Sequence, residues 1–328
     1  MPTAAIFGPD GLDVTDWEKA FFRECDPWGF ILFARNVESP DQLRRLTSEL
    51  RNVVGWSAPV LIDQEGGRVQ RLRGPNWREY LPALDQMQRA SRPMRAQWIR
   101  NRLIAAELHD VGIDVNCAPL ADLVETDTHP VLRNRLYAED VETVVEAAGV
   151  CADALISGGV LPVLKHIPGY GRASVDSHHD LPTVRAPLEA LENRDFAPFR
   201  ALNDIGMGMT AHIVFEDIDP ARPATISPLV MSHIRNEIGF AGLIMTDDIS
   251  MQALSGSVVE RSVAAIMAGC DLVLHCNGDA HEMPKVAAAV GEMSRVSIER
   301  ADAALAQRQT PIPVDIPALA AELEALLG

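Results

Sequence analysis

The strongest constraint on the fold is a regular alternation of short β-forming segments with helical ones. Eight short runs predict strands, at residues 4–7, 29–33, 59–63, 113–119, 161–166, 207–213, 242–247 and 271–275. Eight strands alternating with helices favour a (β/α)8 barrel of the TIM type, a single α/β domain that usually takes ~250 residues. The chain of 328 residues is long enough for such a barrel and for terminal additions.

Helix signals lie between the predicted strands. The sequence SPDQ at 39–42 combines a cap, a proline at the first helical position and a capping-box glutamine, and Ser227-Pro228 opens a helix that Gly239 ends. Further helices are expected at 92–111, 139–157, 187–204, 257–268 and 280–294.

A doubly wound open sheet is the structural alternative. It normally has fewer strands and a glycine-rich phosphate loop after the first one, and the sequence GPDG at 8–11 is not such a loop. We therefore expect a barrel catalytic domain over residues 1–294. Residues 295–328, rich in Ala, Leu and Glu, should form C-terminal helices packed on its outside.

Charge and composition limit the possible partners and the compartment. A formal net charge of −17 repels nucleic acid and anionic membrane surfaces, so neither is an expected partner. The five cysteines form no CxxC pair and are expected to be reduced. The N-terminal sequence does not resemble a secretory signal, and no uninterrupted apolar run reaches the ~18 residues of a membrane span. We expect a cytoplasmic protein.

Polar side chains recur where the predicted strands end. In a (β/α)8 barrel the carboxyl ends of all strands converge on one face, which is where such enzymes keep their active sites. Unrelated core histidines would not gather there. The residues in question are Asp63, Asn116, Lys165, His166, His212, Asp247, His275 and Asn277.

The pair Asp247-Asp248 ends the seventh predicted strand. In isolation both aspartates would more often cap a helix. At a barrel mouth, one of them is expected to face the substrate. Asp247 shares strand parity with Leu243 and Met245, which makes it the last side chain of the strand and the better nucleophile, whereas Asp248 begins the turn and suits a cap.

About twenty residues separate the fifth predicted strand from the next helix, and loops of that length are usually functional. Asp176 lies two residues before His178, close enough to fix the imidazole tautomer and to leave the other nitrogen for proton transfer. A solvated polar loop is one alternative and a Zn²⁺ or Fe²⁺ site another. A metal ranks last, because no HxH pair follows the first strand and Lys165 would repel a cation.

The segment DQEGGRVQR at 63–71 places a carboxylate at a strand end, followed by two glycines that allow a tight turn and bring arginine back. A surface loop could have this composition. A carboxylate and an arginine at a barrel mouth also suit a polyhydroxylated ligand, because charge-assisted hydrogen bonds are strong and directional. The segment NRLY at 134–137 is less specific and alone would be a surface turn.

Taken together, LIDQEGGRVQRL, NRLYAED, KHIPGYG with DSH, and IMTDDISM resemble the family 3 glycoside hydrolases. Within that family the chain is similar to the single-domain bacterial β-N-acetylglucosaminidases, or β-hexosaminidases, of peptidoglycan recycling. The resemblance covers about residues 1–290, and the KHxPGxG and DSH loop is its most specific part.

This resemblance implies a role for each matching residue. Asp247 would be the nucleophile that forms a glycosyl-enzyme, and His178, paired with Asp176, the acid/base. The residues expected to hold the non-reducing N-acetylglucosamine (GlcNAc) are Asp63, Arg71, Arg135, Lys165 and His166. Hydrolysis would retain the anomeric configuration by double displacement and would require no metal or organic cofactor.

The implied substrate is a small glycan, a GlcNAc-β-1,4-anhydro-N-acetylmuramoyl peptide, and a monomer is expected. Two rival functions remain open. A GlcNAc phosphorylase would transfer the sugar to inorganic phosphate, which a neutral histidine does not repel as a carboxylate would. A non-catalytic muropeptide sensor would tolerate the loss of Asp247 or His178, and both residues are present.

Overall fold

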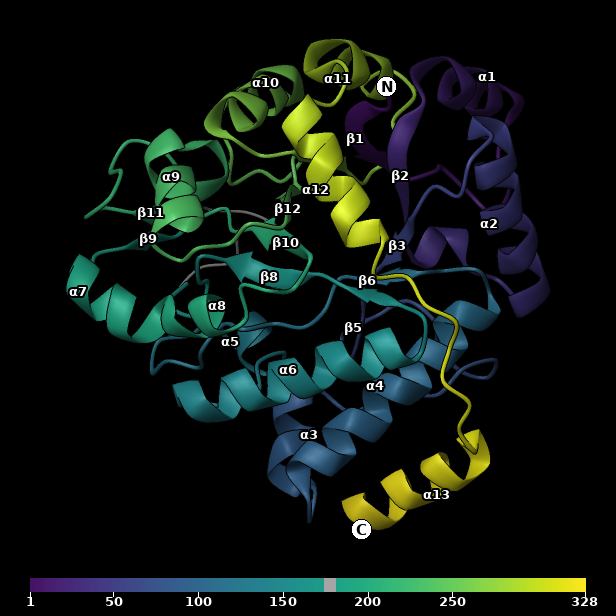
Figure 1. The fold of residues 1–328 in the computed structure, drawn as a ribbon, viewed down its shortest axis with the longest axis vertical. Helices are drawn as coiled ribbons and strands as arrows, with labels where there is room; N and C mark the ends of the chain where they lie inside the picture. The colour runs from purple at the N-terminus through teal and green to yellow at the C-terminus, as the bar shows by residue number, and fades with distance from the viewer. Residues whose placement is uncertain (174–180) are drawn as a thin grey trace.

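The computed structural model describes residues 1–173 and 181–328 and folds as a parallel β-barrel surrounded by helices (Figure 1). The sheet runs in the order β7-β6-β3-β2-β1-β13-β12-β10-β8, and every pairing within it is parallel. Its strands are β1 (Thr3–Phe7), β2 (Pro27–Leu32), β3 (Val60–Ile62), β6 (Val115–Asn116), β7 (Leu161–Pro162), β8 (Leu164–Ile167), β10 (Met207–Thr210), β12 (Leu243–Asp248) and β13 (Leu272–His275).

The two ends of the sheet, β7 and β8, are consecutive in the sequence, and the chain that joins them closes the barrel. β7 pairs with β6, and β8 pairs with β10 on the other side. Between them, the Val163 amide donates to the carbonyl of Ala118 at 2.8 Å. The nine short strands are therefore eight barrel positions, and the predicted (β/α)8 fold is confirmed. Each of the eight runs predicted from the sequence contains or overlaps an observed barrel strand.

The helices cover the outside of the sheet (Figure 1). Side-chain caps begin several of them, including reciprocal capping boxes at Thr15 and Ser257. The longer helices are α1 (Asp16–Cys25), α2 (Pro40–Val54), α4 (Pro93–Asp110), α6 (Val141–Ser157), α9 (Pro228–Asn236), α10 (Val258–Ala268) and α11 (Met283–Val290).

Three helix predictions need correction. Ser39 caps α2 as expected, but Gln42 accepts from the amide of Glu38 instead of completing a capping box. The helix expected at 187–204 is divided into α7 (Leu188–Ala190), a π-turn at Leu191–Asp195 and α8 (Ala197–Ala201), because Pro198 cannot donate a hydrogen bond within a continuous helix. The helix expected at 280–294 ends four residues early, where Gly291 has a positive φ of 65°.

Smaller elements lie among the loops. Residues Gln64–Gly66 (β4) and Val69–Gln70 (β5) form an antiparallel hairpin, and Thr183–Val184 (β9) pairs in parallel with Val214–Phe215 (β11). The short helices are η1 (Ala34–Asn36), α3 (Ala83–Arg89), α5 (Pro130–Arg133) and η3 (Ala224–Ile226). The sequence did not predict these elements, nor α1.

Two C-terminal helices follow α11. Helix α12 (Arg295–Leu305) packs against β12, with Ser297 and Arg300 both bonding to Asp271 at 2.8 Å. Helix α13 (Ile316–Leu327) lies along α4 at the edge of the molecule (Figure 1). The domain boundary between residues 294 and 295 stays a prediction.

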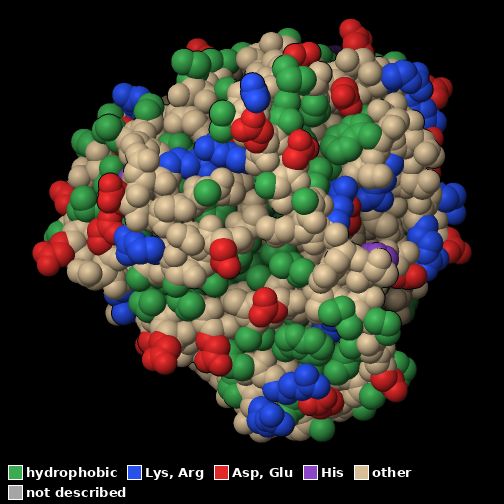
Figure 2. Space-filling view, viewed as in Figure 1, with side chains coloured by type: hydrophobic (Ala, Val, Ile, Leu, Met, Phe, Trp, Pro, Cys, Tyr) green, Lys and Arg blue, Asp and Glu red, His purple; other side chains and the backbone are tan. Residues whose placement is uncertain are grey.

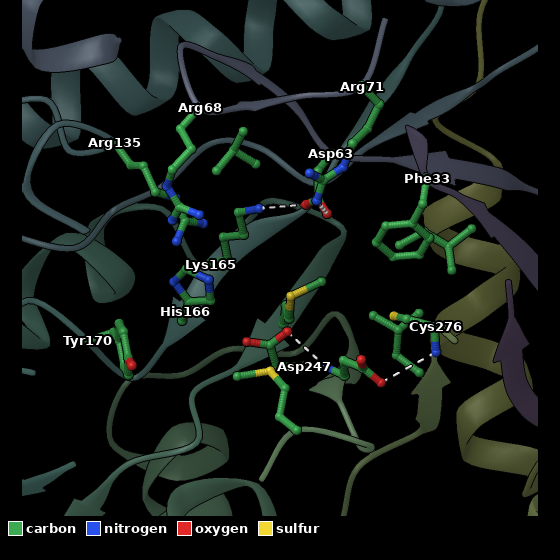
Figure 3. A pocket seen from close by; sticks show the side chains of 16 residues that line it. Phe33, Asp63, Arg68, Arg71, Arg135, Lys165, His166, Tyr170, Asp247 and Cys276 are labelled. Atoms are coloured by element: carbon green, nitrogen blue, oxygen red, sulfur yellow. Dashed lines mark hydrogen bonds and ion pairs between the residues drawn. The ribbon is translucent and has the colours of Figure 1, made fainter. Parts of the chain in front are cut away.

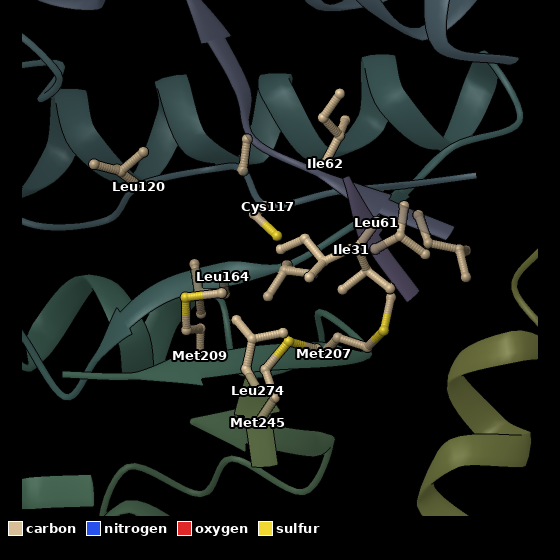
Figure 4. Close-up of a cluster of buried hydrophobic side chains, with 14 of the residues drawn as sticks. Ile31, Leu61, Ile62, Cys117, Leu120, Leu164, Met207, Met209, Met245 and Leu274 are labelled. Atoms are coloured by element: carbon tan, nitrogen blue, oxygen red, sulfur yellow. The ribbon is translucent and has the colours of Figure 1, made fainter. Parts of the chain in front are cut away.

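Aliphatic and sulfur-containing side chains fill the barrel interior (Figure 4). They come from successive strands and are almost completely buried, as the layered core of such a barrel requires. Three of these side chains, Ile31, Met209 and Leu274, also line the cavity described below. The barrel core therefore forms the floor of that cavity.

Charged side chains of both signs are interspersed on the face that Figure 2 shows. The excess of acidic residues is therefore not gathered into a single patch on that face. None of the helices in the described part of the chain combines the length and apolar character that crossing a membrane would take.

Candidate active site

A cavity of about 200 Å³ opens at the carboxyl ends of the barrel strands (Figure 3). Strand ends β3, β8, β12 and β13 contribute to its wall, together with the β4–β5 hairpin. It brings together six of the eight residues expected to have a catalytic or sugar-binding role, Asp63, Arg71, Arg135, Lys165, His166 and Asp247. The other two, Asp176 and His178, lie outside the described residues.

Asp63 follows β3 and is held between two cations. Its Oδ1 lies 2.9 Å from Lys165 Nζ, and its Oδ2 lies 3.0 Å from Arg71 Nη2. Burial alone would raise the pKa of this carboxyl, but the charges of Lys165 and Arg71 outweigh it and hold the pKa far below its usual range. Asp63 is therefore ionised and could accept hydrogen bonds from the hydroxyls of a ligand.

Glu65 is a site residue that sequence reasoning missed. Its carboxylate lies 2.6 Å from Lys165 Nζ and makes a bidentate pair with Arg135, at 2.8 and 2.9 Å. Burial opposes its ionisation, but Arg135 and Lys165 lower its pKa to about 2. The backbone carbonyl of Glu65 also accepts from buried Arg100. Its position two residues after Asp63 in the DQEGG segment was the available signal.

Lys165 is almost completely buried yet charged. Burial disfavours its ammonium form, but Asp63 and Glu65 outweigh that effect and raise the pKa above its usual value. A buried lysine with two carboxylate partners is fixed in position, because a change in its rotamer would leave those carboxylates unpaired.

The β4–β5 hairpin carries Arg68 and Arg71 to the cavity. Gly66 and Gly67 make its turn with positive φ angles of 103° and 58°, which L side chains rarely adopt. Asn116 supports the hairpin from below, since its Oδ1 accepts from the amide of Gln64 at 3.0 Å. Asn116, which the strand-end pattern placed at the active face, is thus a buried supporting residue and does not line the cavity.

His166 is oriented by Asp122, the second site residue that the sequence did not reveal. Nδ1 of His166 lies 2.8 Å from Asp122 Oδ2, and the same carboxylate accepts from the amides of His166 and Tyr170. Asp122 is 1% exposed. These bonds engage Nδ1, so Nε2 is the ring nitrogen left for a ligand. A lone aspartate within the apolar sequence PLADLV was a signal for such a buried anchor.

Asp247 lies near the end of β12 and lines the cavity, where its Oδ1 accepts from the amide of Asp248 at 2.7 Å. Burial raises the pKa of this carboxyl, but His212, His166 and that amide together outweigh burial and lower it. The side chain is therefore ionised near neutral pH, as a nucleophilic carboxylate must be.

Asp248 organises the turn after β12. It accepts from the amide and hydroxyl of Ser250 at 3.1 and 2.8 Å and from the amide of Cys276 at 3.3 Å. It caps a turn and not a helix, because the next helix begins only at Val258. Unlike the expectation that only one aspartate faces the site, Asp248 also contributes to the cavity lining.

The two other strand-end histidines do not line the cavity. His212 is buried, with its ring between Thr225 Oγ1 at 2.7 Å and the carbonyl of Asp248 at 3.0 Å, and burial lowers its pKa. His275 Nε2 lies 3.3 Å from Glu282. Within residues 1–173 and 181–328, no group of three His, Cys, Asp or Glu side chains could hold a metal ion.

The fold and the site define a class of protein, a (β/α)8 enzyme whose polar pocket holds an ionised aspartate. The profile described as "Glycosyl hydrolase family 3 N terminal domain" matches residues 25–309. The chain belongs to the family 3 glycoside hydrolases.

Several relatives have a known name or structure. A protein named "Beta-hexosaminidase" from Methylococcus capsulatus is 38% identical over 266 residues, which are 79% of this chain and 78% of that protein. One of the same name from Nitrosomonas eutropha is 34% identical over 276 residues, 81% of this chain and 78% of the relative.

Solved structures agree in fold over the whole chain. NagZ from Neisseria gonorrhoeae in complex with N-trifluoroacetyl-D-glucosamine superimposes with a TM-score of 0.84 at 30% identity, covering 100% of this chain and 98% of that one. A family 3 β-N-acetylglucosaminidase from Paenibacillus sp. str. FPU-7 gives 0.87 at 29% identity, covering 98% of this chain and 66% of its own.

Proposed function

We propose that the protein is a retaining exo-β-N-acetylglucosaminidase that removes non-reducing terminal GlcNAc from peptidoglycan fragments, GlcNAc-β-1,4-anhydro-N-acetylmuramoyl peptides. The observation that carries this proposal is an ionised Asp247 in a small cavity whose opposite wall holds the Asp63–Lys165 pair. The hexosaminidase names of the relatives and the glucosamine derivative bound to the gonococcal structure support it.

In the first step, a carboxylate oxygen of Asp247 attacks the anomeric carbon while the bond to the leaving oxygen breaks. That oxygen takes a proton from His178, and a glycosyl-aspartate ester remains. In the second step, His178 accepts a proton from water as the water oxygen attacks the same carbon. GlcNAc leaves with its β configuration retained, and both Asp247 and His178 return to their starting states.

The acid/base assignment rests on the sequence alone, because Asp176 and His178 lie outside the described residues. Histidine is suited to both proton transfers, since its ordinary pKa of ~6.5 allows it to donate and to accept near neutral pH. Asp176 would bond to one ring nitrogen and leave the other for the glycosidic oxygen. No metal or organic cofactor enters either step.

The cavity wall supplies the binding groups for the sugar. Asp63, ionised and already aligned by Lys165 and Arg71, would accept from two adjacent sugar hydroxyls. Arg135 and His166 lie on the same wall and would reach the 2-acetamido region (Figure 3). Because Glu65 and Asp122 hold these side chains in place, little rotamer freedom would be lost when the sugar binds.

The proposal includes a cytoplasmic monomer whose partner is a small glycan and not a nucleic acid or a membrane. The net charge of −17 supports the exclusion of polyanionic partners.

Three measurements test the proposal. The enzyme should release p-nitrophenol from the aryl β-GlcNAc glycoside much faster than from the β-glucoside, and faster release from the glucoside would refute the hexosaminidase assignment. Proton NMR of the early product should show β-GlcNAc, and the α anomer would exclude double displacement. Added inorganic phosphate should leave the product as GlcNAc, whereas GlcNAc-1-phosphate would identify the phosphorylase.

A further inference from the structure

We propose that Arg68 selects for an anionic leaving group, binding a carboxylate on the part of the substrate that departs. This inference rests on the proposed function and adds a specificity-determining residue to it. The contacts of the cationic side chains in the cavity carry the argument.

Four cationic side chains line the cavity, and three of them are neutralised within the protein. Arg71 pairs with Asp63, Arg135 pairs with Glu65, and Lys165 contacts both carboxylates. The fourth, Arg68, forms no ion pair with any residue that the structure describes. Within residues 1–173 and 181–328, its guanidinium donates one hydrogen bond, 3.4 Å long, from Nη2 to the carbonyl of Val131.

Arg68 also differs from the other cations in exposure. The Lys165 side chain is 2% exposed and that of Arg135 16%, whereas Arg68 belongs to the exposed residues. The Arg68 and Arg135 side chains reach into the cavity from the same side (Figure 3). The backbone beneath Arg68 is fixed, because the amide of Gly67 donates to the carbonyl of Tyr80 at 2.8 Å. Arg68 is thus a solvent-facing cation on a fixed turn at the cavity mouth.

The position relative to Asp247 decides which part of the substrate Arg68 meets. A terminal GlcNAc attacked by Asp247 occupies the inner cavity, and it carries no charge. Its leaving group extends toward solvent, where Arg68 lies. In a protein of net charge −17, an anionic leaving group is repelled at long range. A local cation that forms no ion pair among the described residues offsets that repulsion where the bond is cleaved.

The decisive experiment compares two leaving groups that differ in one charge. The substrates are GlcNAc-β-1,4-N-acetylmuramic acid and its lactyl methyl ester, with N,N′-diacetylchitobiose as a neutral reference. For the native enzyme kcat/KM should be higher for the acid than for the ester. In Arg68→Gln this acid-to-ester ratio should fall about tenfold, mainly through KM, because a charge-assisted hydrogen bond is lost. Arg68→Lys should retain part of the ratio.

Arg295→Gln is the matched control. It removes one positive charge from an exposed arginine on α12 that pairs with Glu299, so it changes the net charge equally without touching the cavity. It should leave the acid-to-ester ratio unchanged. If it lowers the ratio as much as Arg68→Gln does, the overall field and not a contact is responsible, and the proposal is wrong.

A substrate that carries the stem peptide separates the two possible sources of the carboxylate. If Arg68→Gln lowers kcat/KM only for the peptide-bearing substrate, the recognised carboxylate lies on the peptide, and the proposal stands. An Arg68→Gln enzyme with native ratios for both substrates would overturn it. Failure of the native enzyme to cleave chitobiose and aryl β-GlcNAc would instead refute the proposed function.

Discussion

At the scale of single residues, the cavity wall is an alternating chain of charges. It runs Arg71, Asp63, Lys165, Glu65, Arg135, and each carboxylate lies between two cations. Burying these groups singly would be costly, and their alternation offsets much of that cost. The chain also makes the site rigid, because no member can move without leaving a partner unpaired. A rigid wall of this kind suits recognition of a neutral sugar, whose hydroxyls offer only directional hydrogen bonds.

Asp247→Asn should abolish turnover while leaving the fold intact, because the amide keeps the shape of the side chain but loses the nucleophilic charge. The expected loss in kcat is about 10³-fold or more. Asp248→Asn is the matched control and should be much milder, since its remaining carbonyl oxygen can still accept from Ser250. A reversed order of the two effects would move the nucleophile to Asp248. Trapping with a 5-fluoro glycosyl donor and peptide mapping should locate the label on Asp247.

His178→Ala should slow cleavage of poor leaving groups by about 10²-fold or more and affect activated aryl glycosides far less in the first step. A good leaving group needs little protonation as it departs. The second step still needs a base, so an activated substrate should show a burst followed by stalling. The next residue in the sequence, His179, is also a histidine, so His179→Ala is the control. A larger loss in that variant would transfer the proton-transfer role to His179.

The site residues at strand ends could be predicted from the sequence, but the carboxylates that hold the site residues in place could not. Asp63, Lys165 and Asp247 each end an apolar run, so strand topology alone brings them to one face. Glu65 lies in the three-residue strand β4 and Asp122 in a loop. The course of both segments depends on tertiary packing, so no local period in the sequence indicates their partners.

At the scale of elements, the β4–β5 hairpin places two arginine side chains of the cavity on top of the barrel strands. It stands on Asn116 below and carries Arg68 and Arg71 above. The sequence indicated its turn through the glycine pair, but not its pairing, because strands of two or three residues leave no measurable alternation. The barrel strands were predictable because burial on both faces makes them continuous apolar runs. The helix expected at 187–204 is interrupted ahead of Pro198, because a proline inside a helix removes a backbone hydrogen bond and clashes with the preceding turn.

Gly66→Ala should destabilise the protein and reduce activity together. A Cβ there would lie 2.0 Å from Arg100 Nη2 and 2.9 Å from the carbonyl oxygen of Leu81, in a residue with φ of 103°. Beyond the ~1–2 kcal/mol cost of a left-handed conformation, this crowding should add about 1–3 kcal/mol and displace the hairpin. Unfolding in urea and kcat/KM measure the two effects.

Gly55→Ala provides the control for Gly66→Ala. Gly55 ends α2 with a φ of 78°, and an added Cβ would meet nothing within 4 Å. It should show the conformational cost alone, with normal kcat/KM. Equal destabilisation of the two variants would mean that the surrounding residues shift and relieve the crowding at Gly66.

At the scale of the whole molecule, the buried charges link stability to pH. The Glu65 carboxyl has a pKa of about 2 in the native state against an ordinary value of 4.5. A group whose pKa is lowered by folding stabilises the native state fully above its unfolded pKa, and this contribution is lost as pH falls toward the folded pKa. The contribution of Glu65 should therefore be complete at pH 7 and disappear between about pH 4.5 and pH 2.

Glu65→Gln should accordingly be less stable than the native protein at pH 7, by an amount that shrinks as the pH is lowered from 4.5. Acidification also reduces the net charge of −17 and so changes the stability of any variant. The native protein and Glu65→Gln share that effect, so the difference between their free energies of unfolding isolates the contribution of Glu65. Urea midpoints at pH 7, 5, 4 and 3 measure it. Glu322→Gln, which removes a partly exposed surface carboxylate paired with Arg95, should show a small difference throughout, because surface pairs contribute little. A Glu65→Gln difference that stays constant from pH 7 to pH 3 would mean that the carboxylate between Lys165 and Arg135 does not stabilise the fold through its charge.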